Sequence, residues 1–279
     1  MRDFSGDTAL LSLNTATVQA QWTLEQCIEG CARHGIGGIA PWRDKLAECG
    51  AARAALLIRE AGLRVTGLCR GGMFPATEPA GRQAALDDNR KAIDDAATIG
   101  AECLILVVGG LPDGSKDIAG ARMQVRDGIA ALLEHSRAAG VPLAIEPLHP
   151  MYAADRACVN TLKQANDLCD ALGDGVGMAV DVYHVWWDPD LEAEIARAGA
   201  AGRILGFHVS DWLVPTTDLL LDRGMMGDGV IDIPKIRGWV EAAGYDGASE
   251  VEIFSKDNWW RQDADDVLAT CVQRHQTAV

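Results

Sequence analysis

Short apolar runs alternate with longer mixed stretches along the whole chain. Each run holds five to seven residues rich in Val, Ile and Leu, without the polar alternation of a half-exposed strand. Runs of this kind predict strands that are buried on both faces, as in a parallel sheet covered by helices. The eight runs are 10–14, 36–41, 65–69, 103–109, 141–147, 176–182, 204–210 and 248–254.

The stretches between these runs carry helix signals. They are 24–34, 51–62, 83–99, 117–139, 161–172, 190–201, 233–243 and 263–274. Thr23 and Thr161 suit N-cap positions, whereas Gly140 and Gly244 end their helices. The alternation predicts right-handed βαβ units, so we expect an α/β fold, a (β/α)8 TIM barrel forming a single domain over residues 1–279. A doubly wound open sheet is the alternative, but no GxGxxG motif follows the first run.

Charge and composition narrow the class of protein. The chain has 25 basic and 40 acidic residues, a net charge of −15, which would repel a phosphate backbone, so nucleic acid is not an expected partner. No apolar run approaches the ~18 residues of a membrane span, and the acidic start differs from a signal peptide. Eight cysteines without a CxxC pair are expected to be reduced core residues. We therefore expect a soluble, cytoplasmic protein with no membrane partner.

Four polar side chains stand inside the last four apolar runs or at their ends. They are Glu146 in VPLAIEP, Asp181 in GMAVDVYH, His208 in ILGFHVS and Glu252 in SEVEIF. In a parallel barrel all four emerge at the C-terminal rim, the face where barrel enzymes hold their active sites. Oxygen-rich ligation with one imidazole suits Mn²⁺ first, and Mg²⁺, Co²⁺ or Zn²⁺ also. The sequence therefore predicts a site for one divalent metal ion.

Such a site would act on a hydroxy-carbonyl group. The metal polarises the carbonyl and stabilises the enediolate that forms when the neighbouring C–H is deprotonated. Ordinary solvated charges at strand ends are the alternative, but four of them within consecutive apolar runs argue for a metal. Glu250 lies two residues before Glu252 on the same face and is its rival for the last position.

From about residue 20 to the end, the chain resembles the xylose-isomerase-like barrel proteins known as sugar phosphate isomerases/epimerases. That family includes ketose 3-epimerases and inosose dehydratases. The most specific segments are IEPLHP, AVDVYH, GFHVSD, RGMMGDG and GYDGASEVEIFS. The resemblance implies that Glu146, Asp181, His208 and Glu252 bind one metal ion, and its spacing favours Glu252 over Glu250.

The resemblance also implies roles in catalysis and substrate binding. In 3-epimerase-like members the two metal-bound glutamates exchange the substrate proton from opposite faces, so Glu146 and Glu252 become the expected acid/base pair. His184, three residues after Asp181, and Arg223, before GMMGDG, match substrate-binding positions. The loop between His208 and Arg223 is longer than the family pattern.

The sequence departs from the family pattern in the loop after Glu146. Epimerase-type relatives carry a carboxylate six residues after the first glutamate, where this chain has Tyr152, which puts free-ketose 3-epimerisation in doubt. We expect Tyr152 to contact substrate and His149 to be a candidate general acid or base, because imidazole titrates near neutrality.

Six tryptophans follow predicted strands, and Trp186 and Trp187 are the expected pocket walls for a substrate larger than a bare sugar phosphate. The six are Trp42, Trp186, Trp187, Trp212, Trp259 and Trp260.

The sequence is compatible with several functions. The first is an isomerase or epimerase of a small-molecule sugar or keto-sugar. The second is a lyase on the same scaffold, either a dehydratase or an enzyme that cleaves 3-keto-glycosides, including C-glycosides, by β-elimination. An endonuclease IV-like enzyme is disfavoured, because it needs histidines where this chain has Cys69-Arg70 and Gly109-Gly110. A metal-binding subunit that supports a partner protein is the non-catalytic alternative, and a homo-oligomer is compatible with the rim tryptophans.

Overall fold

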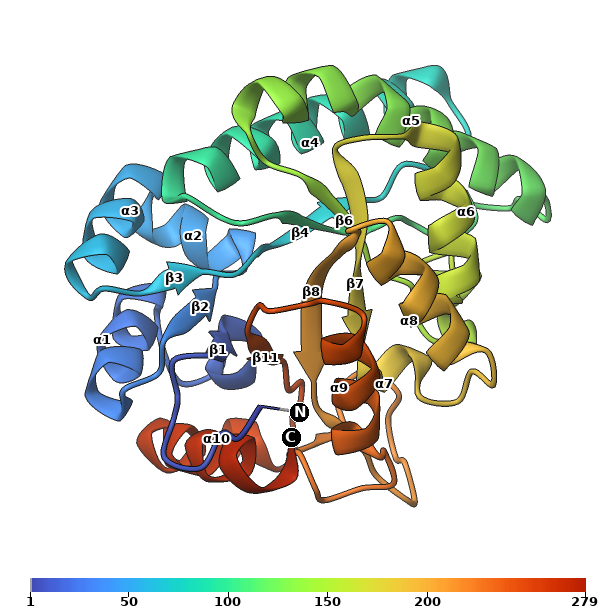
Figure 1. The fold of residues 1–279 in the computed structure, drawn as a ribbon. Helices are drawn as coiled ribbons and strands as arrows, with labels where there is room; N and C mark the ends of the chain where they lie inside the picture. The colour runs from blue at the N-terminus through green and yellow to red at the C-terminus, as the bar shows by residue number, and fades with distance from the viewer. Residues whose placement is uncertain (1) are drawn as a thin grey trace.

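Parallel strands surround a central axis in this computed structural model, which describes residues 2–279 (Figure 1). Nine parallel strands of the described chain form one sheet in the order β3-β2-β1-β11-β8-β7-β6-β5-β4. The strands are β1 (Leu11–Asn14), β2 (Gly38–Ala40), β3 (Arg64–Val65), β4 (Leu68–Gly72), β5 (Leu104–Val107), β6 (Leu143–Ile145), β7 (Val176–Asp181), β8 (Ile204–Val209) and β11 (Ser249–Val251). The sheet is nearly closed, and β3 and β4 are the two halves of the third barrel strand. The predicted TIM barrel is confirmed.

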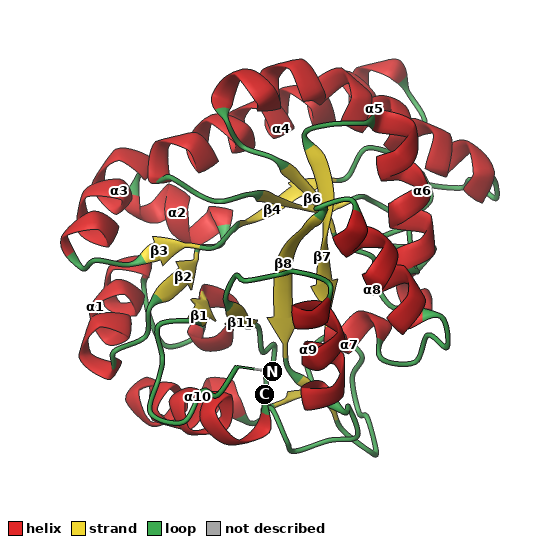
Figure 2. Cartoon of the chain, in the orientation of Figure 1, coloured by secondary structure: helices red, strands yellow, loops and turns green. Residues whose placement is uncertain are grey.

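Helices form the outer ring around these strands (Figure 2). They are α1 (Leu24–His34), α2 (Arg43–Cys49), α3 (Ala51–Glu60), α4 (Pro79–Ile99), α5 (Ile118–Ala139), α6 (Leu162–Leu172), α7 (Val182–Val185), α8 (Leu191–Ala200), α9 (Ile233–Ala242) and α10 (Ala264–Ala278). Thr23 caps α1 in a capping box with Gln26, Thr161 caps α6, and Gly140 ends α5 in the left-handed conformation, as expected. The short helices α2 and α7 were not predicted from the sequence. None of the helices in residues 2–279 combines the length and the hydrophobicity that a membrane span requires.

Strand register places the polar positions at one end of the barrel. In the parallel pairing, Asp181 lies opposite His208, and His208 lies opposite Glu250. Below this level the barrel interior is filled by small and aliphatic side chains, including Cys103, Ile105, Ala144 and Ala179. All eight cysteines are free, as predicted. The barrel therefore has an apolar interior beneath a polar layer at its C-terminal end.

A two-stranded hairpin extends the chain beyond β8. Its strands are β9 (Asp211–Trp212) and β10 (Arg223–Gly224), and they pair antiparallel to each other. The Asp211 carboxylate accepts hydrogen bonds from the backbone N–H groups of Gly227, Gly229 and Ile231, which holds the following loop in place. This hairpin returns Arg223 to the C-terminal end of the barrel.

Candidate metal centre

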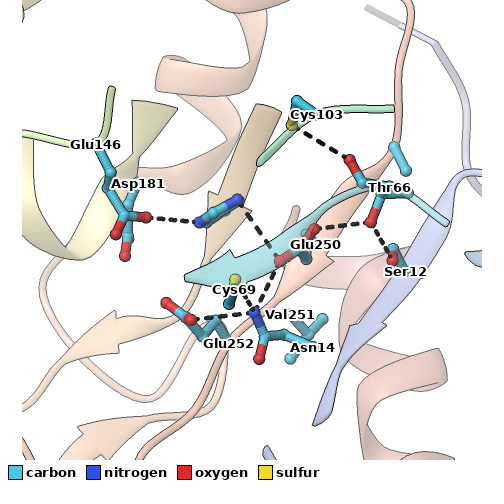
Figure 3. A network of polar contacts seen from close by, with 12 residues as sticks. Ser12, Asn14, Thr66, Cys69, Cys103, Glu146, Asp181, Glu250, Val251 and Glu252 are labelled. Carbon is cyan, nitrogen blue, oxygen red and sulfur yellow. Dashed lines mark hydrogen bonds and ion pairs between the residues drawn. The ribbon is translucent and has the colours of Figure 1, made fainter. Parts of the chain in front are cut away.

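Four buried side chains meet at the C-terminal end of the barrel. The ligand atoms of Glu146, Asp181, His208 and Glu252 all lie within 4.8 Å of one another. Glu146 directly follows β6, Asp181 ends β7, His208 belongs to β8 and Glu252 follows β11 (Figure 3). These four strands are consecutive neighbours in the sheet, so each contributes one side chain. We call this group the carboxylate–histidine cluster.

Two atoms of the carboxylate–histidine cluster face each other at ion-pair distance but without good hydrogen-bond geometry. His208 Nδ1 lies 2.8 Å from Glu146 Oε1, yet neither atom has a partner in hydrogen-bond geometry among residues 2–279. Buried polar atoms in folded proteins are nearly always paired, because leaving one unpaired costs about 1–3 kcal/mol. A cation shared by the nitrogen and the oxygen would satisfy both atoms. The cluster therefore fits a metal ion.

The electrostatics of the cluster favour the same conclusion. Burial raises the pKa of Glu252 to about 8; the negative charges of Glu146 and Asp181 add to this rise, and Arg223 partly opposes it. Burial lowers the pKa of His208, but the surrounding glutamates raise it well above its ordinary value. Protonation of both groups would be favoured because this buried site concentrates negative charge. A divalent cation supplies positive charge at the same place, and carboxylate and imidazole ligands suit Mn²⁺ and related ions.

Glu250, the rival for the fourth position, is held in a different network. Asn14 Nδ2 donates to Glu250 Oε1 over 2.8 Å, and Thr66 Oγ1 donates to Glu250 Oε2 over 2.7 Å (Figure 3). The same Asn14 nitrogen donates to Glu252 Oε1 over 3.0 Å. Glu250 Oε1 lies 3.5 Å from His208 Nε2, the nitrogen that points away from Glu146. Glu250 thus lies behind the imidazole, in the position from which carboxylates commonly orient metal ligands.

Arg223 is the cation inside this cluster. Its Nη1 donates to Asp181 Oδ2 and to Glu252 Oε2, both over 3.1 Å. Its guanidinium carbon lies 4.5 Å from the ring centre of Tyr183 and 5.1 Å from that of Phe254. Two carboxylates and two aromatic rings therefore fix the guanidinium in one orientation.

His184 is fully enclosed beside Arg223. Its Nε2 lies 3.0 Å from Arg223 Nη2, and its Nδ1 accepts a hydrogen bond from the backbone N–H of His149 over 3.2 Å. Burial lowers the pKa of His184 to about 3, with Asp181 opposing the shift and Arg223 adding to it. The imidazole is therefore neutral at physiological pH.

A small pocket of about 30 Å³ opens onto the cluster. Five of the predicted site residues line it: Glu146, Glu252, His184, Arg223 and Tyr152. Asp181 and His208 lie beneath its floor, with exposures of 0% and 1%. Trp42 and Phe254 form aromatic walls, and their rings meet edge to face with centroids 5.4 Å apart. The pocket thus joins the proposed catalytic, metal and substrate-binding positions.

Three of the predicted loop residues, His149, Trp186 and Trp187, lie outside the lining of this pocket. The His149 ring packs against Trp212, with centroids 4.9 Å apart, and against Trp187 at 5.8 Å, and Trp186 also packs against Trp212 at 5.7 Å. None of the three side chains is among the described residues that line the pocket. The tryptophan wall is instead Trp42, whose Nε1 donates to Asn14 Oδ1 over 2.8 Å. Among residues 2–279, His149 contacts the site through its backbone N–H, which donates to His184.

The sequence interpretation did not single out Asn14 and Thr66. Both side chains are buried polar groups within apolar strand runs, LLSLN and VTGLC. A polar residue inside such a run was the signal that identified the four cluster residues, and it could have identified these two as well.

Comparisons with known proteins place the chain in a family. The family model described as xylose isomerase-like TIM barrel matches residues 28–271. An inosose isomerase from Halalkalibacterium halodurans is 25% identical over 146 residues, which are 51% of this chain and about half (49%) of that relative. A Sinorhizobium meliloti 1021 protein of known crystal structure is 62% identical, with a TM-score of 0.95 over 96% of this chain and 98% of that one. The IolI protein, solved with a zinc atom, shares the fold at 19% identity, with a TM-score of 0.80 over 95% of this chain and 97% of its own. The chain therefore belongs to the xylose isomerase-like TIM barrel family.

Proposed function

We propose that this protein is a divalent-metal-dependent isomerase or epimerase of a sugar or keto-sugar, working by proton abstraction next to a carbonyl group. The observation that carries the proposal is the convergence of Glu146, Asp181, His208 and Glu252 beneath a pocket that two of them line. Its homologues are sugar-modifying enzymes, which supports the assignment to an enzyme class. The substrate is accordingly a small molecule.

The metal ion belongs at the carboxylate–histidine cluster, with Mn²⁺ as the first candidate. When bound, it would polarise the substrate carbonyl and stabilise the negative charge that develops on the carbonyl oxygen. Glu250 and Asn14 would hold the ligands in place through the contacts to His208 and Glu252.

Glu146 and Glu252 are the proposed acid/base pair. Both line the pocket, and they come from strands on opposite sides of Asp181 and His208 in the sheet order. Glu252 is oriented by Arg223 and Asn14, whereas Glu146 Oε1 has no hydrogen-bond partner among residues 2–279. One carboxylate would remove the proton next to the carbonyl, and the other would return a proton to the intermediate.

Arg223 and His184 would orient the substrate. Both line the pocket and contact each other, with His184 Nε2 3.0 Å from Arg223 Nη2. Because His184 is neutral, it adds no charge beside the guanidinium. His149 would act as a positioning residue for His184 through its backbone N–H.

Tyr152 supports the lyase as the second candidate function. Its ring lines the pocket, its side chain is only 6% exposed, and its hydroxyl has no hydrogen-bond partner in the described chain. Burial raises the pKa of Tyr152, so the hydroxyl keeps its proton. A protonated phenol in this position can donate to the oxygen of a leaving group, as β-elimination from a ketone requires.

Solvent deuterium uptake tests both functions. Mn²⁺-loaded protein, purified alone, is incubated in D₂O with free ketoses, ketose phosphates, inososes and 3-keto-glycosides, and the products are followed by NMR. Deuterium next to a carbonyl, with all substituents retained, is the expected result for an isomerase or epimerase. Release of water or an aglycone would assign the protein to the lyases. Absence of exchange and release across the whole panel, in a preparation with metal bound, would contradict the proposal.

A further inference from the structure

Two arginines at the pocket have no carboxylate partner. Arg70 lies in β4, and Arg156 lies in the loop after β6; both line the pocket above the carboxylate–histidine cluster. In residues 2–279 no carboxylate lies within ion-pair distance of either guanidinium, and the only ring contact is Arg156 over Tyr152 at 5.8 Å. Arg223, in contrast, is ion-paired with both Asp181 and Glu252. Arg70 and Arg156 are therefore the cations of this pocket that no carboxylate neutralises directly.

The backbone around Arg156 is fixed to the end of β5. Gly109 N–H donates to Arg156 O over 3.0 Å, and Cys158 N–H donates back to Gly109 O over 2.9 Å. Gly110 allows this approach, because a Cβ there would lie 2.3 Å from Ala154 O. These backbone hydrogen bonds hold the loop in place, so the backbone position of Arg156 is set before any ligand binds.

Arg70 is fixed in a comparable way and lies near Arg156. Cys69 N–H donates to Pro41 O over 3.0 Å, and Arg43 Nη1 lies within 3.4 Å of Arg70 O. Burial lowers the pKa of Arg70 below its ordinary value, the charge of Arg156 adds to this shift, and the charge of Glu146 partly opposes it. Two partly buried like charges repel each other, and an anion between them would relieve the repulsion.

The charge balance of the loaded site leads to the same expectation. The centre holds four buried carboxylates, Glu146, Asp181, Glu250 and Glu252. A bound divalent metal ion and Arg223 would neutralise three of the four negative charges and leave one. Because Arg70 and Arg156 together carry two positive charges, the whole site would then have a net positive charge on the pocket side. A neutral substrate would leave that charge uncompensated, whereas an anionic substrate would neutralise it.

We propose that Arg70 and Arg156 form an anion subsite that selects a sugar or keto-sugar carrying a phosphate or carboxylate group. Both groups present oxygens that match the planar fork of a guanidinium, and paired arginines favour such recognition over a neutral hydroxyl. The substrate's carbonyl would face the carboxylate–histidine cluster while its anionic group lies at the arginines. This inference rests on the proposed function, because it places the substrate of that reaction.

Anion binding can be measured without turnover. Calorimetric titration of Mn²⁺-loaded protein compares sorbitol, gluconate and sorbitol 6-phosphate, which share a chain length and differ in charge. We expect at least one of the two anions to bind, and its affinity to fall roughly 10- to 100-fold for each arginine replaced in Arg70→Gln and Arg156→Gln. Because a metal ion can itself ligate these anions, dependence on the arginines is the deciding observation. Preference for one of the two anions identifies the group that the subsite takes.

The matched control is Arg59→Gln, which removes the same charge from an exposed position on α3. It should leave anion affinity unchanged, and thermal denaturation should show that all three variants are folded. Anion affinity that survives the Arg70→Gln/Arg156→Gln double variant, or anions that bind no better than sorbitol, would overturn the anion subsite. Deuterium exchange into neutral keto-sugars would then leave the proposed function standing. Arginine-dependent anion binding without any deuterium exchange would reject the proposed function and leave the anion subsite standing.

Discussion

Replacing Glu252 with glutamine is expected to lower the rate of substrate proton exchange by at least about 10³-fold. The amide keeps the size of the side chain and an oxygen for the hydrogen bond from Asn14 or Arg223, but it cannot take up a proton. The measurement is deuterium incorporation from D₂O under single-turnover conditions with Mn²⁺-loaded protein. The metal content of the variant is measured in parallel, since an amide oxygen still ligates.

Glu250→Gln is the matched control for this variant. It makes the same chemical change two residues away, within β11 where Glu252 follows it, and in an equally buried position, with exposures of 3% and 4% for Glu250 and Glu252. Because Glu250 orients His208 and does not line the pocket, we expect a loss of about 10- to 100-fold in metal affinity, and saturating Mn²⁺ should restore much of the rate. Full exchange activity in Glu252→Gln, or equal and irrecoverable losses in both variants, would remove Glu252 from the acid/base pair.

Replacing Asp181 with asparagine is expected to weaken Mn²⁺ binding by at least about 100-fold, since even residues behind the ligands change affinity by 10- to 100-fold. Asparagine retains an oxygen that can accept the Tyr183 N–H, the contact of 2.8 Å that starts α7, so the local fold is expected to persist. What is lost is one negative charge and one carboxylate ligand. Calorimetric titration with Mn²⁺ measures the affinity directly.

Thermal stability gives an independent readout of the same variant. Mn²⁺ at 100 times its dissociation constant should stabilise the wild-type protein by about 2.7 kcal/mol, because it binds only the folded state. The same concentration should leave Asp181→Asn nearly unchanged. Asp190→Asn is the control: Asp190 is exposed and makes no side-chain cap at the start of α8. Wild-type-like stabilisation of Asp181→Asn by Mn²⁺ would exclude Asp181 as a ligand.

The fold and the positions of Glu146, Asp181 and His208 could be predicted from local sequence patterns, whereas the choice of Glu252 over Glu250 came from the family resemblance. Strands of a parallel barrel are apolar on both faces, so a single charged residue such as Asp181 or His208 stands out within its run. The parallel arrangement then places such residues at one end without knowledge of any long-range contact. Helix caps were also predictable, because they depend on nearby residues: Thr23 forms its capping hydrogen bonds with Gln26, only three positions away.

The choice of pocket walls depended on contacts that local patterns do not contain. Trp186 follows β7 as Trp42 follows β2, yet Trp42 lines the pocket and Trp186 packs on Trp212. The difference arises from the hairpin after β8, which brings Trp212 to that side of the barrel. Pairing among Asn14, Thr66 and Glu250 also joins segments up to 236 residues apart. Side-chain direction in loops is set by such packing, and spacing alone does not reveal it.

The most direct measurement is anomalous X-ray scattering from a crystal of the protein loaded with Mn²⁺. One peak per chain is expected, in contact with Glu146, Asp181, His208 and Glu252, with Glu250 outside its coordination sphere. A peak coordinated by Glu250 in place of Glu252 would reverse the assignment of the last ligand. The absence of a peak at these residues, in protein shown to be saturated with the ion, would contradict the metal centre and with it the proposed chemistry.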